Sequence, residues 1–333
     1  MNIYKILKYN KLIKNFRIKS FGIFLLHRFG KRYLALHFDP VLGCNLRCQM
    51  CYFSIEETRK QMQGTFPVSN LPILADALFH RALKLQIGCG TEPSLYKHNR
   101  EIIAIAKTKG VPYISMTSNG NLLTKSGLEE LFAEGLNELT LSMHGVYKET
   151  YERLMVNASY EKFHEILAAV TELKANYPHI KLRINYTVNS DNLMELSDFF
   201  DLYGKYSIDI LQLRPIQKIG DTQYNNFSLD SIIKHYSTTI GKVVDLAKKN
   251  GILCLAPTLK SLTHPTNTNQ LVVESTYCYV SPKYTWRDDF DLASDTYESY
   301  CKRNRVGKSL FKDIFRKKTD YESDIKNLNY TVS

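Results

Sequence analysis

An apolar run and a loop with three cysteines follow one another in residues 33–52, which read YLALHFDPVLGCNLRCQMCY. Residues 33–38 have the composition of a β-strand, and the loop after them carries Cys44, Cys48 and Cys51. Thiolates are the usual ligands of iron–sulfur clusters and also bind zinc. Three thiolates cannot complete a four-iron cube, so one iron would keep an open position for a substrate group.

This first run opens a pattern in which short β-prone segments alternate with helical segments. Strands are predicted at Tyr33–Phe38, Lys84–Ile87, Tyr113–Thr117, Glu138–Met143, Lys181–Val188 and Ile208–Leu213. Helices are predicted near 70–82, 98–109, 124–134, 160–176 and 192–204. Alternation of this kind implies parallel strands joined by crossover helices. The predicted fold is therefore α/β, a partial (β/α)6 TIM-like barrel with a C-terminal extension.

Polar and glycine-rich loops follow all six predicted strands. They contain Cys44, Gly88–Pro93, Ser118–Gly120, His144-Gly145, Asn189 and Arg214-Pro215. Loops after strands collect such residues in any fold. Six of them in register with a cysteine cluster favour a single site at the carboxyl ends of the strands, where (β/α) barrels place their chemistry.

The spacing Cys-x3-Cys-x2-Cys, followed by Tyr52 and placed after the first strand of such a barrel, resembles the radical SAM superfamily over residues 33–215. The resemblance implies an enzyme with a [4Fe–4S] cluster on Cys44, Cys48 and Cys51. The open iron of this cluster would bind the amino and carboxylate groups of S-adenosyl-L-methionine (SAM). Reduction by an electron donor such as flavodoxin or ferredoxin would then give a 5′-deoxyadenosyl radical that abstracts hydrogen from a substrate.

Further motifs extend the resemblance to residues that would bind SAM. Gly90-Thr91-Glu92-Pro93 looks like the family's Gly-Gly-Glu-Pro element, which meets the methionine amine, although Thr91 replaces the second glycine. Arg153 would meet the methionine carboxylate, with a helix-surface arginine as the alternative. The full set implied by the resemblance is Tyr52, Gly90, Glu92, Ser118, Asn119, Ser142, Arg153 and Asn185. No catalytic side chain is predicted.

The alternation fades after about residue 220, so the chain divides into three predicted parts. Residues 1–32 are a basic amphipathic N-terminal segment, 33–215 the core, and 216–333 a C-terminal extension with a helix over 229–249. The extension weakly resembles SPASM or twitch extensions, which carry an auxiliary iron–sulfur cluster. Its candidate ligands are Cys254, Cys278 and Cys301, with ordinary free thiols as the alternative.

Basic residues gather at the two ends of the chain. The net charge is +11, and residues 1–38 hold nine Lys or Arg and no acidic residue. A helix there would pack on the protein's own body or touch an anionic surface. We expect no transmembrane segment and no signal peptide, and hence a cytoplasmic protein. In that reducing compartment seven cysteines are better cluster ligands than disulfide partners.

A zinc-stabilised, nucleic-acid-binding protein is the alternative function. Its zinc would need a fourth ligand such as Cys89 or His37. The basic ends and 22 Tyr side chains, which could stack on bases, are its support. The substrate of the enzyme is left open by the sequence, between a peptide and a small molecule resembling a sugar or alcohol.

Overall fold

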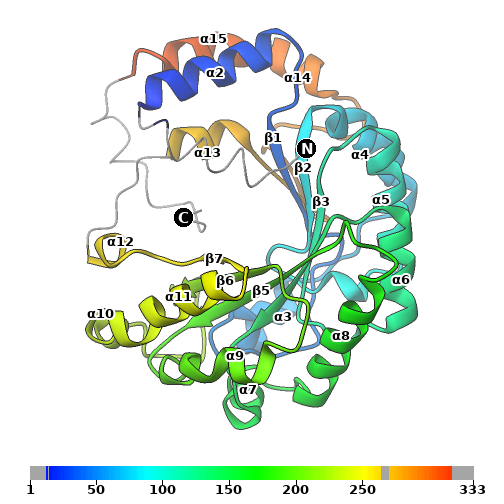
Figure 1. Cartoon of the computed structure of the whole chain (residues 1–333). Helices are drawn as coiled ribbons and strands as arrows, with labels where there is room; N and C mark the ends of the chain where they lie inside the picture. Colours follow the sequence, from blue (N-terminus) through cyan, green and yellow to red (C-terminus); the bar gives the residue numbers. More distant parts are fainter. Residues whose placement is uncertain (1–12, 14, 264–269, 317–333) are drawn as a thin grey trace.

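The computed structural model describes residues 13, 15–263 and 270–316. Nine strands form one sheet in the order β7-β6-β5-β4-β3-β2-β1-β8-β9. All neighbouring pairs are parallel except β8 and β9, which pair antiparallel. The sheet curls, and helices cover its outer face (Figure 1). The predicted partial barrel is therefore confirmed, and β7 and β9 are the open edges of the sheet.

All six predicted strands are present, and their ends differ from the prediction by at most two residues. They are β1 Leu34–Phe38, β2 Ala82–Ile87, β3 Ile114–Ser118, β4 Glu138–Met143, β5 Lys181–Val188 and β6 Ile210–Pro215. The connecting helices are α4 Leu71–Leu78, α5 Asn99–Thr108, α6 Lys125–Glu134, α8 Tyr160–Leu173 and α9 Phe199–Tyr203. Two short helices between β1 and β6 were not predicted, α3 Glu56–Gln61 and α7 Lys148–Leu154.

The helix predicted over 229–249 is divided in the structure. It consists of α10 Asp230–Lys234, a π-helical turn at Ser237–Gly241 and α11 Lys242–Lys249. Within the wide turn, the hydroxyl of Thr239 donates a 2.7 Å hydrogen bond to the carbonyl of His235. A β-branched residue that bonds back to the preceding turn distorts regular helical pairing, so the period of the sequence pattern did not reveal the break.

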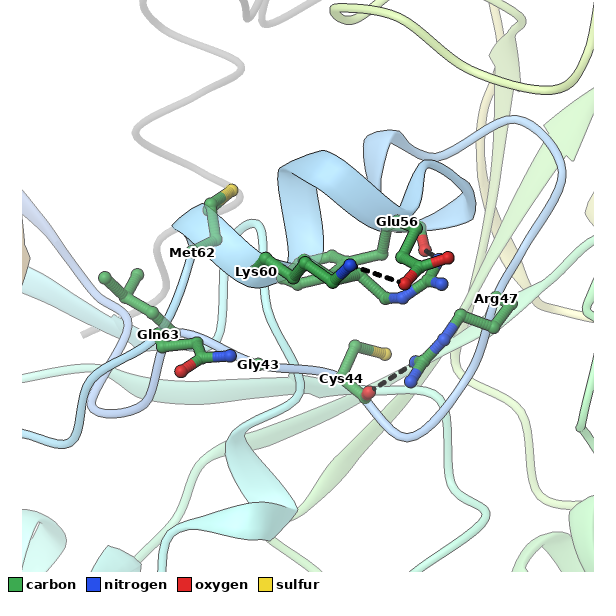
Figure 2. Close-up of a pocket in the computed structure, with 10 residues that line it drawn as sticks. Gly43, Cys44, Arg47, Glu56, Lys60, Met62 and Gln63 are labelled. Carbon is green, nitrogen blue, oxygen red and sulfur yellow. Dashed lines mark hydrogen bonds and ion pairs between the residues drawn. The ribbon is translucent and has the colours of Figure 1, made fainter.

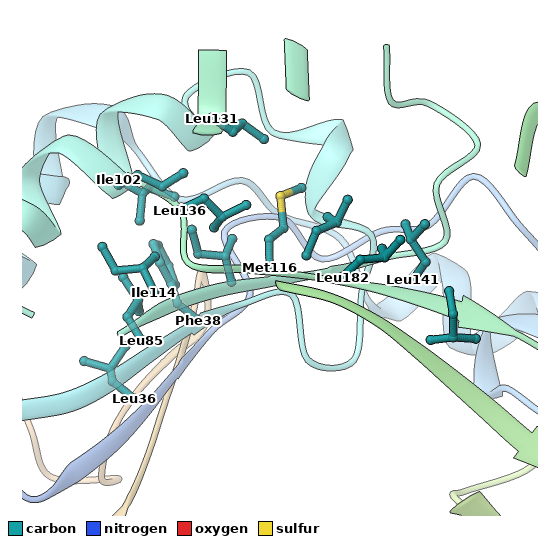
Figure 3. Packing of buried hydrophobic residues seen from close by; sticks show 14 of the residues in the cluster. Leu36, Phe38, Leu85, Ile102, Ile114, Met116, Leu131, Leu136, Leu141 and Leu182 are labelled. Atoms are coloured by element: carbon teal, nitrogen blue, oxygen red, sulfur yellow. The ribbon is translucent and has the colours of Figure 1, made fainter. Parts of the chain in front are cut away.

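One face of the sheet is apolar and packs against the helices. Side chains alternate between the two faces of a strand, so every second residue of β1 to β5 points toward the helices. Figure 3 shows this packing, which includes Leu36, Leu85, Met116, Leu141 and Leu182 from the strands and Ile102 and Leu131 from α5 and α6. Burying each such side chain stabilises the fold by about 1.5–3 kcal/mol.

The other face of the sheet carries charged and polar side chains into the barrel. The guanidinium of Arg183 lies 3.1 Å from the carboxylate of Glu138, which is 1% exposed. Lys84 lies beside this pair, and burial lowers its pKa while the charge of Glu138 partly restores it. Gln86 accepts a 3.1 Å hydrogen bond from Lys84 and donates to the carbonyl of Gly88 at 3.3 Å. This layer therefore supports the start of the loop after β2.

The segment after residue 216 adds strands to both edges of the same sheet. β7 (Leu253–Leu255) pairs with β6, β8 (Tyr277–Ser281) pairs with β1, and β9 (Tyr284–Thr285) pairs with β8. Sequence analysis missed these strands. Tyr277–Ser281 is β-prone, but its parallel pairing with β1 joins distant parts of the chain, and no local pattern specifies such a partner.

Helices from the two ends of the chain lie together on one side of the molecule (Figure 1). They are α2 Phe16–Arg28, α13 Gln270–Thr276, α14 Tyr297–Arg303 and α15 Val306–Asp313, while α12 Leu259–Thr263 follows β7. The hydroxyl of Tyr297 lies 2.7 Å from Nδ1 of His27 and also forms a hydrogen bond with the hydroxyl of Tyr33.

Within the described ranges, no helix has the length and apolar character needed to cross a membrane.

Candidate functional site

A cavity of about 230 Å³ lies at the carboxyl ends of the central strands. It lies beside residues 43–52, which carry Cys44, Cys48 and Cys51 and are called the cysteine loop. It gathers residues from the last positions of β3 to β6 and from loops that follow the strands, as the register of a parallel barrel requires. The lining residues used below are Cys44, Cys48, Cys51, Tyr52, Cys89, Gly90, Glu92, Ser118, Asn119, Ser142, His144, Thr187 and Arg214. Most of the residues that the sequence singled out therefore meet at one place.

The three thiols of the cysteine loop open onto this cavity. Burial raises the pKa of Cys44 to about 12, and burial with the charges of Cys51 and Cys44 raises the pKa of Cys48 well above its usual range. Bound cations would reverse these shifts, because a coordinating thiol is deprotonated. A four-iron cube takes each thiolate on a different iron, so three separate thiols facing one cavity fit such a cube.

A single metal ion makes a different demand on its ligands. It needs three or more side chains that converge on one point. In the part of the chain that the structure describes, no group of three His, Cys, Asp or Glu side chains is arranged to hold one ion. The alternative of a zinc-stabilised, nucleic-acid-binding protein therefore finds no support among these residues.

Two arginines hold the cysteine loop in shape from its outer side. Arg47 donates hydrogen bonds to the carbonyls of Cys44 and Leu46, at 2.8 and 2.7 Å. Arg59 of α3 donates to the carbonyl of Phe53 at 2.8 Å. Hydrogen bonds from charged donors are about twice as strong as neutral ones, so they keep an irregular loop in one conformation.

A second pocket of about 380 Å³ lies on this outer side of the loop (Figure 2). Its lining includes the three cations Arg47, Arg59 and Lys60 and one carboxylate, Glu56, which pairs with Lys60 at 2.7 Å. Cys44 lines both this pocket and the strand-end cavity. The strand-end cavity and this positively charged pocket therefore meet at Cys44.

Glu92 ties the loop after β2 to the loop after β3. Its side chain is 2% exposed, and its carboxylate accepts hydrogen bonds from Oγ of Ser94 at 2.6 Å, Oγ of Ser118 at 2.7 Å and the main-chain N–H of Asn119 at 2.8 Å. Burial raises the pKa of Glu92, and these donors lower it in part. Glu92 therefore positions one wall of the cavity. Asn119 continues this wall, because its amide donates to Asn45 in the cysteine loop at 2.8 Å.

Sequence reasoning missed Asp39, which holds the loop after β2 from the opposite side. The carboxylate of Asp39 is buried and accepts hydrogen bonds from the N–H groups of Cys89 and Gly90 and from the hydroxyl of Tyr279, at 2.6, 3.1 and 2.9 Å. The carbonyl of Gly90 in turn accepts a 2.5 Å bond from the hydroxyl of Tyr52. An acidic residue directly after the first strand was the available signal, but Tyr279 arrives on the unpredicted β8.

Two predicted cofactor residues lie outside the lining of the cavity. The side chain of Arg153, on α7, is 45% exposed and pairs with Asp191 at 3.1 Å. Asn185 lies on β5 and pairs in register with Ser142 of β4. Its buried Oδ1 has no hydrogen-bond partner in the described part of the chain. The roles given to Arg153 and Asn185 stay predictions.

Two other strand-end residues supply polar groups to the cavity instead. Arg214, at the end of β6, is the one Lys or Arg among the described residues that line it. Burial lowers the pKa of His144 to about 4, so its ring is neutral near pH 7. The buried Nδ1 of His144 has no hydrogen-bond partner among the same residues. Both residues were placed at strand ends by the sequence, but neither was given a role in binding a cofactor.

The candidate ligands of an auxiliary cluster come from separate elements. Cys254 lies on β7 at one edge of the sheet, and Cys278 lies on β8, opposite Leu36 of β1. Six strands stand between β7 and β8 in the order of the sheet, and Cys301 lies on α14. Within the described residues nothing gathers these three thiols, and the auxiliary cluster stays a prediction.

Residues 39–200 match the family model described as "Radical SAM superfamily". A probable GTP 3′,8-cyclase from Saccharolobus solfataricus is 25% identical over 195 residues, which cover 58% of this chain and 61% of that protein. A probable GTP 3′,8-cyclase from Metallosphaera sedula is 26% identical over 196 residues, covering 59% and 60%. The chain thus spans about three-fifths of the length of these relatives.

Solved structures share the fold at low sequence identity. SuiB from Streptococcus suis, bound to S-adenosylmethionine, aligns with a TM-score of 0.58 and 17% identity, over 75% of this chain and 59% of SuiB. The protein anSMEcpe with bound AdoMet aligns with a TM-score of 0.51 and 20% identity, over 67% and 63%. Both likenesses concern the fold, which in each neighbour holds SAM.

The matched family region contains most of the walls of the cavity. It includes the cysteine loop, the two carboxylates Asp39 and Glu92 that hold the loop after β2, and the strand ends at Ser118 and Ser142. A [4Fe–4S] cluster and SAM are the cofactors of this family, and the three thiols beside a strand-end cavity suit them. Residues 39–200 carry a radical SAM domain.

Proposed function

We propose that Cys44, Cys48 and Cys51 hold a [4Fe–4S] cluster with one iron open to SAM. The observation that carries the proposal is that these three thiols line the same cavity as the strand-end residues. When bound, the cluster and SAM together supply an electron and a 5′-deoxyadenosyl radical for hydrogen abstraction. The chain's own task is to hold both partners in position and to exclude side reactions.

The walls of the cavity provide groups that suit the polar parts of SAM. Glu92 and Asp39 fix the loop after β2, so its main-chain groups keep their positions without reorganising when a ligand arrives. Ser142 presents a hydroxyl from β4, and Tyr52 lies beside Gly90 at the base of the cysteine loop. In this proposal Gly90, Ser142 and Tyr52 contact SAM, whereas Glu92, Ser118 and Asn119 position those contacts.

The substrate in this proposal is a peptide or small molecule that carries an acidic group and enters beside β4 to β6. Arg214, His144 and Thr187 line that side of the cavity. A guanidinium binds a carboxylate or phosphate with two parallel hydrogen bonds, and a neutral imidazole can donate or accept one more. The relatives named above are probable GTP cyclases, and SuiB has also been solved with its precursor peptide SuiA. Both classes of substrate fit the proposal.

The electron donor is proposed to dock on the outer side of the cysteine loop. Arg47, Arg59 and Lys60 give the outer pocket a positive charge (Figure 2). Acidic redox proteins such as a flavodoxin or ferredoxin complement this charge, which speeds their approach and orients them. Cys44 borders both pockets, so a donor at this surface lies one loop away from the proposed cluster.

Reductive cleavage of SAM is the experiment that tests this function. Protein reconstituted anaerobically with iron and sulfide should hold about four irons per chain. With dithionite in place of the natural donor, it should convert SAM to 5′-deoxyadenosine and methionine, and a sample without dithionite should not. Protein that holds four irons but gives no 5′-deoxyadenosine would contradict the proposal, as would colourless protein with one zinc per chain.

A further inference from the structure

Helix α2 exposes a large apolar surface although it is already packed on the protein body. Its inner side, which includes Ile23 and His27, faces the body, and α15 and α13 are its neighbours. Its outer side carries Ile18, which is 56% exposed, and Phe21, and Phe29 directly after the helix is 68% exposed. Residues three or eight positions apart lie on the same side of a helix, so Ile18 and Phe21 share one side of α2 and Phe29 continues that side just after the helix ends. A surface helix is normally polar on its outer side.

Two further aromatic rings are exposed beside α2, Phe311 on α15 and Phe315 just after α15. Phe311 packs against Phe24 of α2 with ring centroids 5.3 Å apart, and Phe315 follows at 5.5 Å from Phe311. Phe311 and Phe315 are both exposed, the latter to 65%. The two helices run side by side on the outside of the molecule (Figure 1). We call this surface the α2–α15 face and define it by Ile18, Phe21, Leu26, Phe29, Phe311 and Phe315.

The rim of the α2–α15 face is basic. Exposed cations lie on both helices, namely Arg17, Arg28, Lys308 and Lys312, and Lys31 follows shortly after α2. Helix α2 contains no acidic residue, and the one acidic residue of α15, Asp313, lies 3.7 Å from Arg316. Exposed apolar side chains gathered on two neighbouring helices indicate an interaction site, and cations around them select for a negatively charged partner.

We propose that the α2–α15 face binds the surface of an anionic lipid membrane. Exposed aromatic and aliphatic side chains enter the boundary between headgroups and acyl chains, while Arg and Lys remain at the phosphates. A second copy of the chain is a poorer occupant, because a two-fold contact would bring two basic rims together. The described helices are too short or too polar to cross a bilayer, so this contact is peripheral.

The proposal predicts that the full chain sediments with vesicles made of equal parts phosphatidylcholine and phosphatidylglycerol. It should bind pure phosphatidylcholine vesicles much more weakly, and added salt should release it. Replacing Arg17 and Arg28 together by glutamine should weaken binding about 25-fold, since each cation near an anionic surface contributes roughly a fivefold factor. Replacing Phe29 and Phe315 together by serine should weaken binding roughly tenfold or more, because their apolar area no longer enters the membrane.

Matched variants elsewhere on the surface distinguish vesicle binding by the α2–α15 face from nonspecific binding through any exposed apolar or basic residue. Met194 is 58% exposed, so Met194→Ser removes a comparable apolar group outside the face. Lys248→Gln with Lys249→Gln removes two exposed cations from α11. The Met194 variant should bind vesicles like the wild type, and the lysine pair should lose far less than the arginine pair, because α11 lies outside the face.

Three results would overturn the proposal. The first is that wild-type protein does not bind the anionic vesicles at low salt. The second is that both pairs of variants in the α2–α15 face bind as tightly as the wild type. The third is a wild-type dimer without vesicle binding that becomes a monomer when Phe29 and Phe315 are replaced, which light scattering after size-exclusion chromatography detects. That last result would assign the face to a second copy.

Discussion

Replacing any one of Cys44, Cys48 and Cys51 with alanine is expected to abolish reductive cleavage of SAM. Each thiolate in our proposal binds a different iron, so losing one exposes a second iron and leaves the cluster on two ligands. Replacing a residue that only hydrogen-bonds to a metal ligand and orients it lowers metal affinity or activity roughly 10–100-fold. Loss of a ligand itself should cost more than about a hundredfold. The measurement is 5′-deoxyadenosine formed with dithionite, alongside iron per chain.

Cys89 provides a matched control for this experiment. Its thiol also lines the cavity, but it lies 3.4 Å from Nδ1 of His37 and outside the cysteine loop. Cys89→Ala should keep the iron content of the wild type and much of its SAM cleavage. If Cys48→Ala behaved like Cys89→Ala, with full iron and full cleavage, the loop would not be the cluster site.

Replacing Glu92 with alanine is expected to cost both stability and SAM cleavage. The change leaves the hydroxyls of Ser94 and Ser118 and the N–H of Asn119 without their buried acceptor. An unsatisfied buried donor costs about 1–3 kcal/mol, so the free energy of unfolding should fall by about 3 kcal/mol or more. Because the loops after β2 and β3 would also separate, SAM cleavage should fall roughly 100-fold even in reconstituted protein. Urea unfolding and the cleavage assay measure the two effects.

Glu92→Gln is the graded control, because glutamine keeps the shape of the side chain. Its carbonyl can accept from Asn119, but its NH2 group must then face the N–H of Ser94, which donates to Glu92 at 3.0 Å. We therefore expect losses between those of wild type and Glu92→Ala. A Glu92→Ala protein with the stability and cleavage rate of the wild type would show that Glu92 does not hold this wall.

The strands that form the barrel could be predicted because their signals are local. β1 to β6 each combine an apolar or alternating run with a turn-rich loop, and the parallel register then brings the loops after them to one edge. That is why Cys44, Glu92 and Ser142 could be assigned to one site from the sequence. The outcome confirms the fold class and places these residues on one cavity.

The remaining parts depend on contacts between distant residues. The carboxylate of Asp39 accepts a hydrogen bond from Tyr279, and Tyr279 lies close enough only because β8 pairs with β1. Arg214 lies at the end of β6 and Arg153 lies on α7, and the placement of these two elements in the fold decides that Arg214 and not Arg153 lines the cavity. Glu138 belongs to a strand whose polar residues suggest a solvent-facing side, yet Glu138 and Thr140 are buried inside the curved sheet, where Arg183 pairs with Glu138.

The central claim is that three thiolates hold a four-iron cluster whose remaining iron binds SAM. The most direct measurement is electron–nuclear double resonance on the reduced wild-type protein, with SAM labelled isotopically in its amino nitrogen. Our account predicts a coupling between that nitrogen and the cluster, which disappears when Cys44, Cys48 and Cys51 are replaced together. A reduced four-iron protein that shows no such coupling at saturating SAM would contradict it.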